Sequence, residues 1–396
     1  MINWKERNYI IKKIINFFSQ FIVFFEKKNY YEISSKNYYN YFGYHDKIPF
    51  SKDNKRLLLH LGEKKKNIIK VGFFNIKENK IKLIDQTKAW SWQLGSMLQW
   101  VDGNNSLIFN CLRKKKLVSK LINIKDKKFH YYKLPIYCLN KQGTKALSIN
   151  FKKLYNLRLG YGYNYNNNIY LNKNSLNDGI YLLNLINKNY KKILDFKKII
   201  SFLKLKKNDN YYINHITFSP NSDSITFYFI LANTKIRKIY PINYNLNKKK
   251  FLLIEKNYNF SHYCWISNNE LLVSCHDSLF KFEYYVYNLS SNKKKKIQLN
   301  LNKDGHPMLN PRNKDLVVSD TYPNIFGFQK LFIFSISKKK IIWQTLINSR
   351  FYKFNFHKRC DLHPRWNYNG NSVSIDTVAN GDRSIRIYKF KSNKIL

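Results

Sequence analysis

The chain has 396 residues, of which 44% are hydrophobic, and this apolar content excludes wholesale disorder, a collagen-like fibre and a coiled coil. Lys and Arg number 71 against 24 Asp and Glu, which gives a formal charge of +47. Such a charge is typical of proteins that bind nucleic acid, an anionic membrane or an acidic sugar. Here the lysines are scattered through turns and only 11 of the 71 bases are Arg, so we expect codon bias toward Lys to be the main source of the charge.

The cysteines are spread along the chain without a CxxC pair, at Cys111, Cys138, Cys264, Cys275 and Cys360. This pattern indicates neither a zinc knuckle nor a disulfide framework, and it favours a reducing compartment. The most hydrophobic stretch, residues 14–25, is shorter than the roughly 20 residues that span a bilayer, and no signal-peptide cleavage pattern follows it. We therefore predict a cytoplasmic protein.

Apolar residues in segment 10–25 recur with the period of a helix, which predicts an amphipathic helix. We divide the chain into residues 1–36, which hold this helix and a lead-in strand, and residues 37–396. Two interpretations of the helix stay open. It packs against the body of the protein, or residues 8–28 lie on the inner surface of a membrane, where their lysines face anionic lipids.

One short pattern recurs seven times: apolar residues alternate around a polar centre, and a Lys, Asn or Ser turn follows. The polar centres are Asn75, Asn123, Asn184, Asn245, Asn288, Ser335 and Lys389. Each pattern predicts a strand that enters a hairpin, because period-two alternation bounded by turn formers indicates a half-buried antiparallel pair. A second set of seven polar turns lies between these hairpins, near residues 53, 103, 142, 222, 268, 312 and 369. Two hairpins per unit give four strands, so the sequence predicts an all-β, seven-bladed β-propeller.

Two segments complete this plan. Residues 152–178 form an insertion in blade three, a long loop of the kind in which a rigid scaffold carries functional residues. The last blade has a meagre fourth strand at residues 393–396. We therefore expect residues 30–34 to pair there and close the ring.

The second set of turns lies in the first hairpin of each blade. Four consecutive blades carry a histidine six residues before this first-hairpin turn: His215, His262, His306 and His363. This position begins the innermost strand, so the four side chains are expected to converge at one mouth of the central channel. Convergent imidazoles suit a divalent transition metal, or a neutral base beside one. The alternative is that each histidine caps a strand by bonding to the next blade. A repeated cap is expected in all seven blades, whereas the other three carry Lys47, Met97 and Ile136, which favours a site.

The segments 261–265, 304–307 and 360–365 read Ser-His-Tyr-Cys-Trp, Asp-Gly-His-Pro and Cys-Asp-Leu-His-Pro-Arg. They resemble the oligogalacturonate lyase group of seven-bladed propellers, with TolB-like blades as broader relatives. The resemblance implies that His262 is the base that removes the proton beside a uronate carboxylate. It also implies that His306 and His363 hold a metal, typically manganese, and a cation suits this chemistry because it absorbs the charge that develops as the proton leaves.

The sequence departs from this family at two metal-ligand positions, where Cys360 replaces a Gln and Arg365 replaces a second His. We therefore predict that Arg365 acts at the catalytic site by holding a substrate carboxylate in a bidentate pair, and that His215 joins the metal ligands. Manganese or zinc is the expected cofactor. Further residues near these positions are predicted to bind the substrate: His45, Gln93, Arg158, Tyr161, Asp304, Asp361 and Arg383.

Three functions stay open on the sequence. The first is a carbohydrate-active, lyase-like enzyme that cleaves an acidic saccharide by β-elimination. The second is a non-catalytic propeller that binds a glycan or a partner protein, at the inner membrane surface. The third is binding of polyanions by charge alone. No recognition motif for nucleic acid is visible, so we predict no specific nucleic-acid partner.

Overall fold

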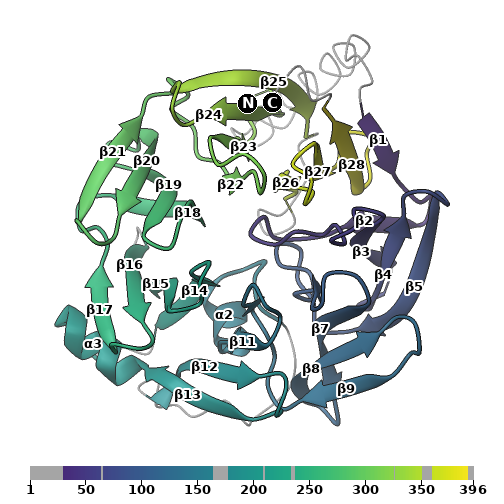
Figure 1. Cartoon of the computed structure of the whole chain (residues 1–396), viewed down its shortest axis with the longest axis horizontal. Coiled ribbons are helices and arrows are strands. Elements are labelled where there is room, and N and C mark those ends of the chain that lie inside the picture. The colour runs from purple at the N-terminus through teal and green to yellow at the C-terminus, as the bar shows by residue number, and fades with distance from the viewer. Residues whose placement is uncertain are drawn as a thin grey trace, which may run out of the picture.

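The computed structural model describes residues 30–63, 66–163, 177–207, 210–232, 237–324, 326–349 and 359–390. Over these residues the chain forms seven four-stranded antiparallel sheets, which stand as blades around a central axis (Figure 1). The prediction of an all-β, seven-bladed propeller is confirmed. The helix predicted over residues 10–25 and the membrane-facing segment 8–28 lie outside the described residues. Among the described helices, none has the length and apolar character needed to cross a membrane.

Each blade is numbered here in chain order and runs from an innermost to an outermost strand. Blade one consists of β2 (Tyr38–Tyr41), β3 (Arg56–Glu63), β4 (Ile69–Asn75) and β5 (Lys80–Thr87). Blade two consists of β6 (Gln99–Trp100), β7 (Ser106–Arg113), β8 (Lys116–Asn123) and β9 (Phe129–Tyr132). Blade three consists of β10 (Cys138–Leu139), β11 (Lys145–Ser148), β12 (Gly179–Asn184) and β13 (Tyr190–Asp195). Blades four and five consist of β14 (Tyr211–Phe218), β15 (Ser224–Leu231), β16 (Lys238–Asn245), β17 (Lys250–Leu253); and β18 (Asn259–Trp265), β19 (Glu270–His276), β20 (Phe282–Asn288), β21 (Lys293–Ile297). Blades six and seven consist of β22 (Met308–Leu309), β23 (Leu316–Asp320), β24 (Phe328–Ser335), β25 (Lys340–Asn348); and β26 (Arg365–Trp366), β27 (Ser372–Thr377), β28 (Ser384–Lys389), β1 (Tyr30–Ile33).

All seven third strands end on the polar centres that the sequence pattern marks. In five of them the centre is an Asn whose side-chain oxygen accepts hydrogen bonds from backbone N–H groups two or three residues later. The residue four positions after the centre has a positive φ in six blades: Asn79, Lys127, Lys188, Lys249, Asn292 and Lys339. The repeat therefore has a local physical cause, because the Asn side chain closes the hairpin turn.

The middle strands of the blades are the most buried, because a neighbouring blade packs on each face. Every residue of β27 is buried, whereas β21 begins with exposed lysines. The largest hydrophobic cluster draws most of its residues from blades three, four and five and includes residues of two short helices, α2 (Phe151–Leu157) and α3 (Phe196–Leu203). α2 belongs to the connection between β11 and β12, where the sequence predicts an insertion.

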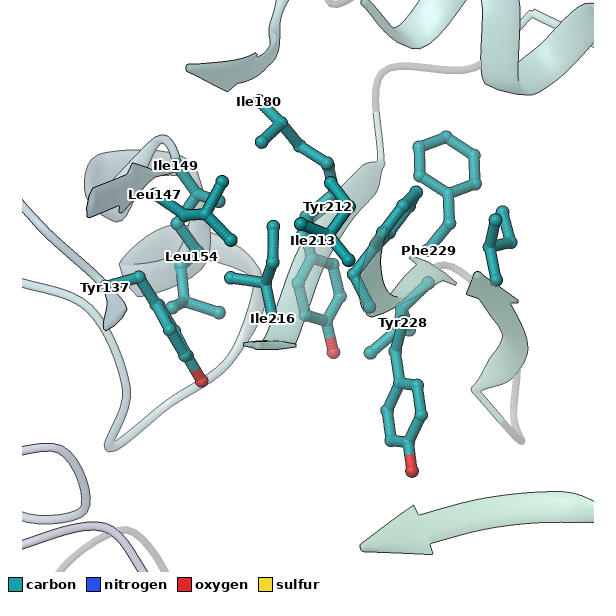
Figure 2. Packing of buried hydrophobic residues seen from close by; sticks show 14 of the residues in the cluster. Tyr137, Leu147, Ile149, Leu154, Ile180, Tyr212, Ile213, Ile216, Tyr228 and Phe229 are labelled. Atoms are coloured by element: carbon teal, nitrogen blue, oxygen red, sulfur yellow. The ribbon is translucent and has the colours of Figure 1, made fainter. Parts of the chain in front are cut away.

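This cluster also supports a residue near the axis. In Figure 2, Ile213 and Ile216 pack among aliphatic neighbours, while Tyr137 and Tyr228 extend their hydroxyl groups away from them. The Tyr137 hydroxyl donates to the Asn214 side chain (2.9 Å) and accepts a hydrogen bond from the backbone N–H of His215 (3.2 Å). The core of blades three and four thus holds the backbone at His215 in place.

The N-terminal strand closes the ring as expected. β1 pairs antiparallel with β28, and the two lie side by side in Figure 1 as the purple and yellow strands. On this seam Glu32 accepts hydrogen bonds from Arg386 Nε (3.1 Å) and Ser384 Oγ (2.7 Å). The partner strand is residues 384–389, and the residues 393–396 that we expected to pair lie outside the described part of the chain.

A buried histidine in blade one makes stability depend on pH. His60 is fully buried in β3, and its Nε2 lies 2.8 Å from Ser96 Oγ. Burial lowers the pKa of His60 to about 4. The unfolded chain takes up this proton near pH 6.5 and the folded chain does not, so stability is lost as pH falls from about 6.5 toward 4. We expect His60 alone to reduce the free energy of unfolding by about 2 kcal/mol between pH 7 and pH 5.

Urea denaturation at pH 7, 6 and 5 measures this effect. Between pH 7 and pH 5 the variant His60→Gln should lose about 2 kcal/mol less of its free energy of unfolding than the native chain does. The matched control for the loss of an imidazole is His276→Gln, which replaces a partly buried histidine of β19. If the free energy of unfolding changes equally with pH in His60→Gln and in the native chain, His60 is not the source of the pH dependence.

Candidate active site

The innermost strands are irregular where the histidines lie. β14 and β18 each shift register beside their histidine. His215 and His363 have φ values of 52° and 45°, and Met97 at the same repeat position of blade two has 57°. Residues other than Gly rarely adopt this left-handed conformation, and such strain concentrates at functional sites. Bulges of this kind redirect a side chain out of the regular ladder.

Five imidazole rings from five blades meet at this position. The ring centroids of His262 and His306 are 4.0 Å apart, and those of His306 and His363 are 4.4 Å apart. His45 lies 5.2 Å from His306, and His215 lies 5.4 Å from His262. Four of the five are at most 3% exposed, and His215 is partly buried. The structure therefore brings together the four histidines of the repeat and His45.

His306 and His363 share one buried carboxylate. Asp320 Oδ1 lies 2.8 Å from His306 Nδ1, and Asp320 Oδ2 accepts the backbone N–H of His363 (3.1 Å). His363 Nδ1 lies 2.7 Å from the carbonyl oxygen of Gly43. With Nδ1 donating in both rings, each Nε2 presents a lone pair, and both Nε2 atoms are buried without a hydrogen-bond partner. Buried polar atoms are normally paired, so these two nitrogens are available to accept a hydrogen bond or to bind a cation.

The pKa values of His363 and His306 are shifted in opposite directions. Burial, the neighbouring His306 and Arg365 hold the pKa of His363 well below its ordinary value. Burial also opposes the charged form of His306, but the Asp320 carboxylate outweighs it and raises the pKa of His306. A metal ion at His306 therefore competes with a proton, which makes its binding weaker at low pH.

Asp361 completes a group of three side chains that can hold a metal. One atom each of His306, Asp361 and His363 lies within 4.8 Å of the others. Arg359 Nε donates to both Asp361 oxygens (2.9 Å each), so a guanidinium already faces this carboxylate. Burial raises the pKa of the Cys360 thiol to about 12. Without a metal ion Cys360 is therefore a neutral thiol, and it lies outside the group of three side chains named above.

His262 is oriented by Asp304. Its Nδ1 lies 3.5 Å from Asp304 Oδ1 and 3.1 Å from Ser261 Oγ, and Ser274 Oγ donates to Asp304 Oδ1 (2.8 Å). Burial and the neighbouring His306 lower the pKa of His262, against the opposing effect of Asp304. His262 is thus neutral at pH 7. A neutral imidazole oriented by a carboxylate is the arrangement of a general base.

Aromatic side chains and one Arg border the histidines. Tyr44 Oη lies 2.5 Å from His215 Nδ1, and the Tyr44 ring lies 6.3 Å from the ring of Tyr161. Arg158, which follows α2, places its guanidinium 5.1 Å from the centre of the Tyr161 ring. Burial, His262 and the charge of Arg158 hold the pKa of His215 well below its ordinary value. The blade-three insertion therefore contributes Arg158 and Tyr161 to the edge of the site.

The structure corrects the role predicted for Arg365. Its guanidinium is fully buried and donates to both Asp376 oxygens (3.2 and 3.0 Å) and to the carbonyl oxygen of Gly43. Asp376 also accepts the backbone N–H groups of Phe42 (3.0 Å) and Gly43 (2.9 Å). Because Asp376 occupies the guanidinium, Arg365 has no face left for a substrate carboxylate. It ties blade seven to the segment that carries His45.

Gln93 and Arg383 also differ from their predicted role in substrate binding. Both are buried, and both donate to the carbonyl oxygen of Arg359, Gln93 through Nε2 (3.0 Å) and Arg383 through Nη2 (2.7 Å). Arg383 donates in addition to the carbonyl oxygen of Trp92 (3.2 Å). These two side chains therefore position the segment that carries Asp361.

Three residues of this region were missed by the sequence analysis: Tyr44, Tyr322 and Arg359. The Tyr322 ring lies 5.6 Å from the His306 ring, and the Arg359 guanidinium lies 5.3 Å from the centre of the Tyr322 ring. Tyr44 and Arg359 sit one and two positions before predicted site residues. That proximity along the chain was the available signal.

Comparison with known proteins adds evidence at the level of fold. No family model and no curated protein matches the sequence. An oligogalacturonate lyase from Vibrio parahaemolyticus superposes with a TM-score of 0.66 over 92% of this chain and 94% of that chain, at 12% sequence identity. The chain has the oligogalacturonate lyase fold. A second oligogalacturonate lyase, in complex with manganese, has a TM-score of 0.64 at 10% identity and covers 92% of this chain and 96% of its own.

The resemblance to the lyase fold, first seen in three short segments, is thus confirmed for the overall structure. The β-propeller domain of the Trilobed protease from Pyrococcus furiosus also superposes, with a TM-score of 0.53 at 10% identity over 92% of this chain and 97% of that one. That domain has an open velcro topology. In the present lyase-like fold the pairing of β1 with β28 closes the ring.

Proposed function

We propose that the protein is a lyase that cleaves an acidic saccharide by β-elimination beside a uronate carboxylate. The observation that carries the proposal is the close contact of a candidate base, His262, with a candidate metal ligand, His306. His262 is a neutral, carboxylate-oriented base, and His306, 4.0 Å away, presents with His363 two buried nitrogens that lack partners. A base beside a cation site is what proton abstraction α to a carboxylate requires.

In this reaction His262 accepts the proton from the carbon next to the uronate carboxylate. The electron pair left behind forms a carbon–carbon double bond as the bond to the neighbouring glycosidic oxygen breaks, and the departing oxygen takes up a proton. Arg158, partly buried at the edge of the site, is the residue that we assign to the substrate carboxylate.

The residues present fit a divalent cation. Two imidazole nitrogens and a carboxylate oxygen, from His306, His363 and Asp361, are donors that suit manganese or zinc. When bound, such an ion supplies positive charge that stabilises the anion formed on proton removal. Cys360 and Arg365 stand at the two positions where the resemblance implies further ligands. Cys360 lies outside the group of His306, Asp361 and His363, and Arg365 is a cation paired with Asp376.

Thermal unfolding with and without MnCl₂ or ZnCl₂ tests the metal part of this proposal. We expect a stabilisation of about 2.7 kcal/mol at a metal concentration a hundred times the Kd. The variant His363→Gln should abolish the stabilisation, and His276→Gln should retain it. The absence of any shift with either metal would refute the metal part. Lyase activity itself is read from the ultraviolet absorbance of the unsaturated product formed from acidic oligosaccharides.

The second candidate is a glycan-binding propeller without catalysis. The contact of Arg359 with Asp361 favours it, because the guanidinium supplies positive charge beside the carboxylate without a metal ion. This candidate expects saccharide binding that is indifferent to metal and no unsaturated product. In either case we propose a cytoplasmic location, with contact to the inner membrane surface through residues 8–28.

A further inference from the structure

A separate cavity opens at the other end of the innermost strands. Its volume is about 1290 Å³, and it is lined by the first-hairpin turns of all seven blades, including Lys52, Gly103, Gln142, Asn221, Asn268, Arg312 and Tyr368. We call it the axial cavity. Of the five clustered imidazoles, His45 alone also lines it. The axial cavity is therefore adjacent to the candidate active site and shares His45 with it, and its other lining residues are different.

The axial cavity presents positive charge. Lys52, Lys141, Arg312 and Lys314 line it, and none of the four forms an ion pair with an acidic side chain of the described residues. The acidic residues of the lining are both engaged. Asp46 pairs with Lys47 (2.6 Å). Asp102 accepts three backbone N–H groups of its own turn. An anionic ligand thus meets free cations.

Amide groups and aromatic rings of the kind that contact sugars form part of the walls of the axial cavity: Asn140, Gln142, Asn221, Asn268, Trp265 and Tyr368. Trp265 and Tyr368 offer apolar ring faces, against which the C–H groups of a sugar ring can pack and an ionised phosphate cannot.

We propose that the axial cavity is a second saccharide-binding site, which takes an acidic oligosaccharide. The carboxylates of this oligosaccharide contact Lys52, Lys141 and Arg312, and its sugar rings contact Trp265 and Tyr368. The choice of a uronate ligand rests on the proposed function, but the site does not use His262 or the metal group. The free cations select an anion, and the aromatic rings of Trp265 and Tyr368 select a saccharide over a phosphate polymer.

Isothermal titration with a galacturonate hexamer tests the proposal. All proteins carry His262→Gln, so that the probe is not consumed and the result does not depend on lyase activity. The added pair Lys141→Gln and Arg312→Gln should weaken binding at one site at least about tenfold. The matched pair Lys293→Gln and Lys295→Gln removes the same charge from the exposed strand β21 and should leave binding unchanged.

Two results would overturn the axial site even if lyase activity is found. One is equal affinity in both double variants. The other is competition by polyphosphate as strong as that by the hexamer, which would show selection by charge alone. Conversely, a loss of binding confined to the Lys141 and Arg312 pair supports the site even if no lyase activity is detected. Maltohexaose, which is neutral, should not bind at the same concentrations.

Discussion

Replacing His262 with Gln is expected to lower kcat for β-elimination by about two to four orders of magnitude. Gln has a similar size and polarity but cannot accept the proton at neutral pH. The surrounding contacts, with Asp304 and Ser261, are polar and tolerate an amide, so the propeller should stay folded. Initial rates of unsaturated-product formation, together with the thermal unfolding midpoint, give both quantities.

Asp304 allows a sharper version of the same experiment. If Asp304 acts by orienting His262, with which it is in contact, Asp304→Asn should lower kcat less than His262→Gln does and leave KM nearly unchanged. His276→Gln serves as the control that removes an imidazole elsewhere. Full activity of His262→Gln would eliminate this residue as the base and would shift the proposal toward the glycan-binding alternative.

Replacing Arg365 with Met is expected to destabilise the fold by about 3 to 5 kcal/mol. The change leaves the buried Asp376 carboxylate without its guanidinium partner and removes the bond to Gly43. Arg113→Ala is the control, at an exposed position of β7 where the guanidinium lies over the Tyr131 ring, and should change stability by at most about 1 kcal/mol. Urea denaturation of the three proteins measures the difference.

The same variant separates a structural from a catalytic role. A catalytic Arg365 predicts lost activity with an unchanged midpoint of unfolding, and that outcome would contradict the structure. Removing the orphaned carboxylate as well, in Arg365→Met with Asp376→Leu, should recover part of the stability, because two apolar groups replace the buried pair. No recovery would mean that the bonds from Asp376 to Phe42 and Gly43 matter more than its charge.

Much of the fold followed from local patterns. The polar centre of each repeat coincides with the end of a third strand, since an Asn such as Asn75 accepts backbone N–H groups of its own turn. The common spacing of His262 and His306 from their turns was also visible. Equivalent positions in successive blades face the same axis, so a shared spacing was enough to bring the rings together.

The charged residues were harder to interpret. Arg365 and Arg158 look alike in the sequence, yet one is buried against Asp376 and the other is partly exposed over Tyr161. Arg359 was not identified, although it contacts Asp361 two residues away. The chain carries many bases, and composition does not tell which of them has an acidic partner.

The sequence by itself determined the number of blades, the positions of their turns and the histidines that would share one address, because alternation and Asx turns act over a few residues. Only the tertiary structure decided which polar groups have a hydrogen-bond or ion-pair partner within the protein. The seam between blades one and seven joins Gly43 to Arg365, more than 300 positions away, and contacts of that kind leave no local pattern. A guanidinium that already has partners, such as that of Arg365, supports the fold, whereas an imidazole nitrogen without a partner, such as His363 Nε2, can bind a ligand.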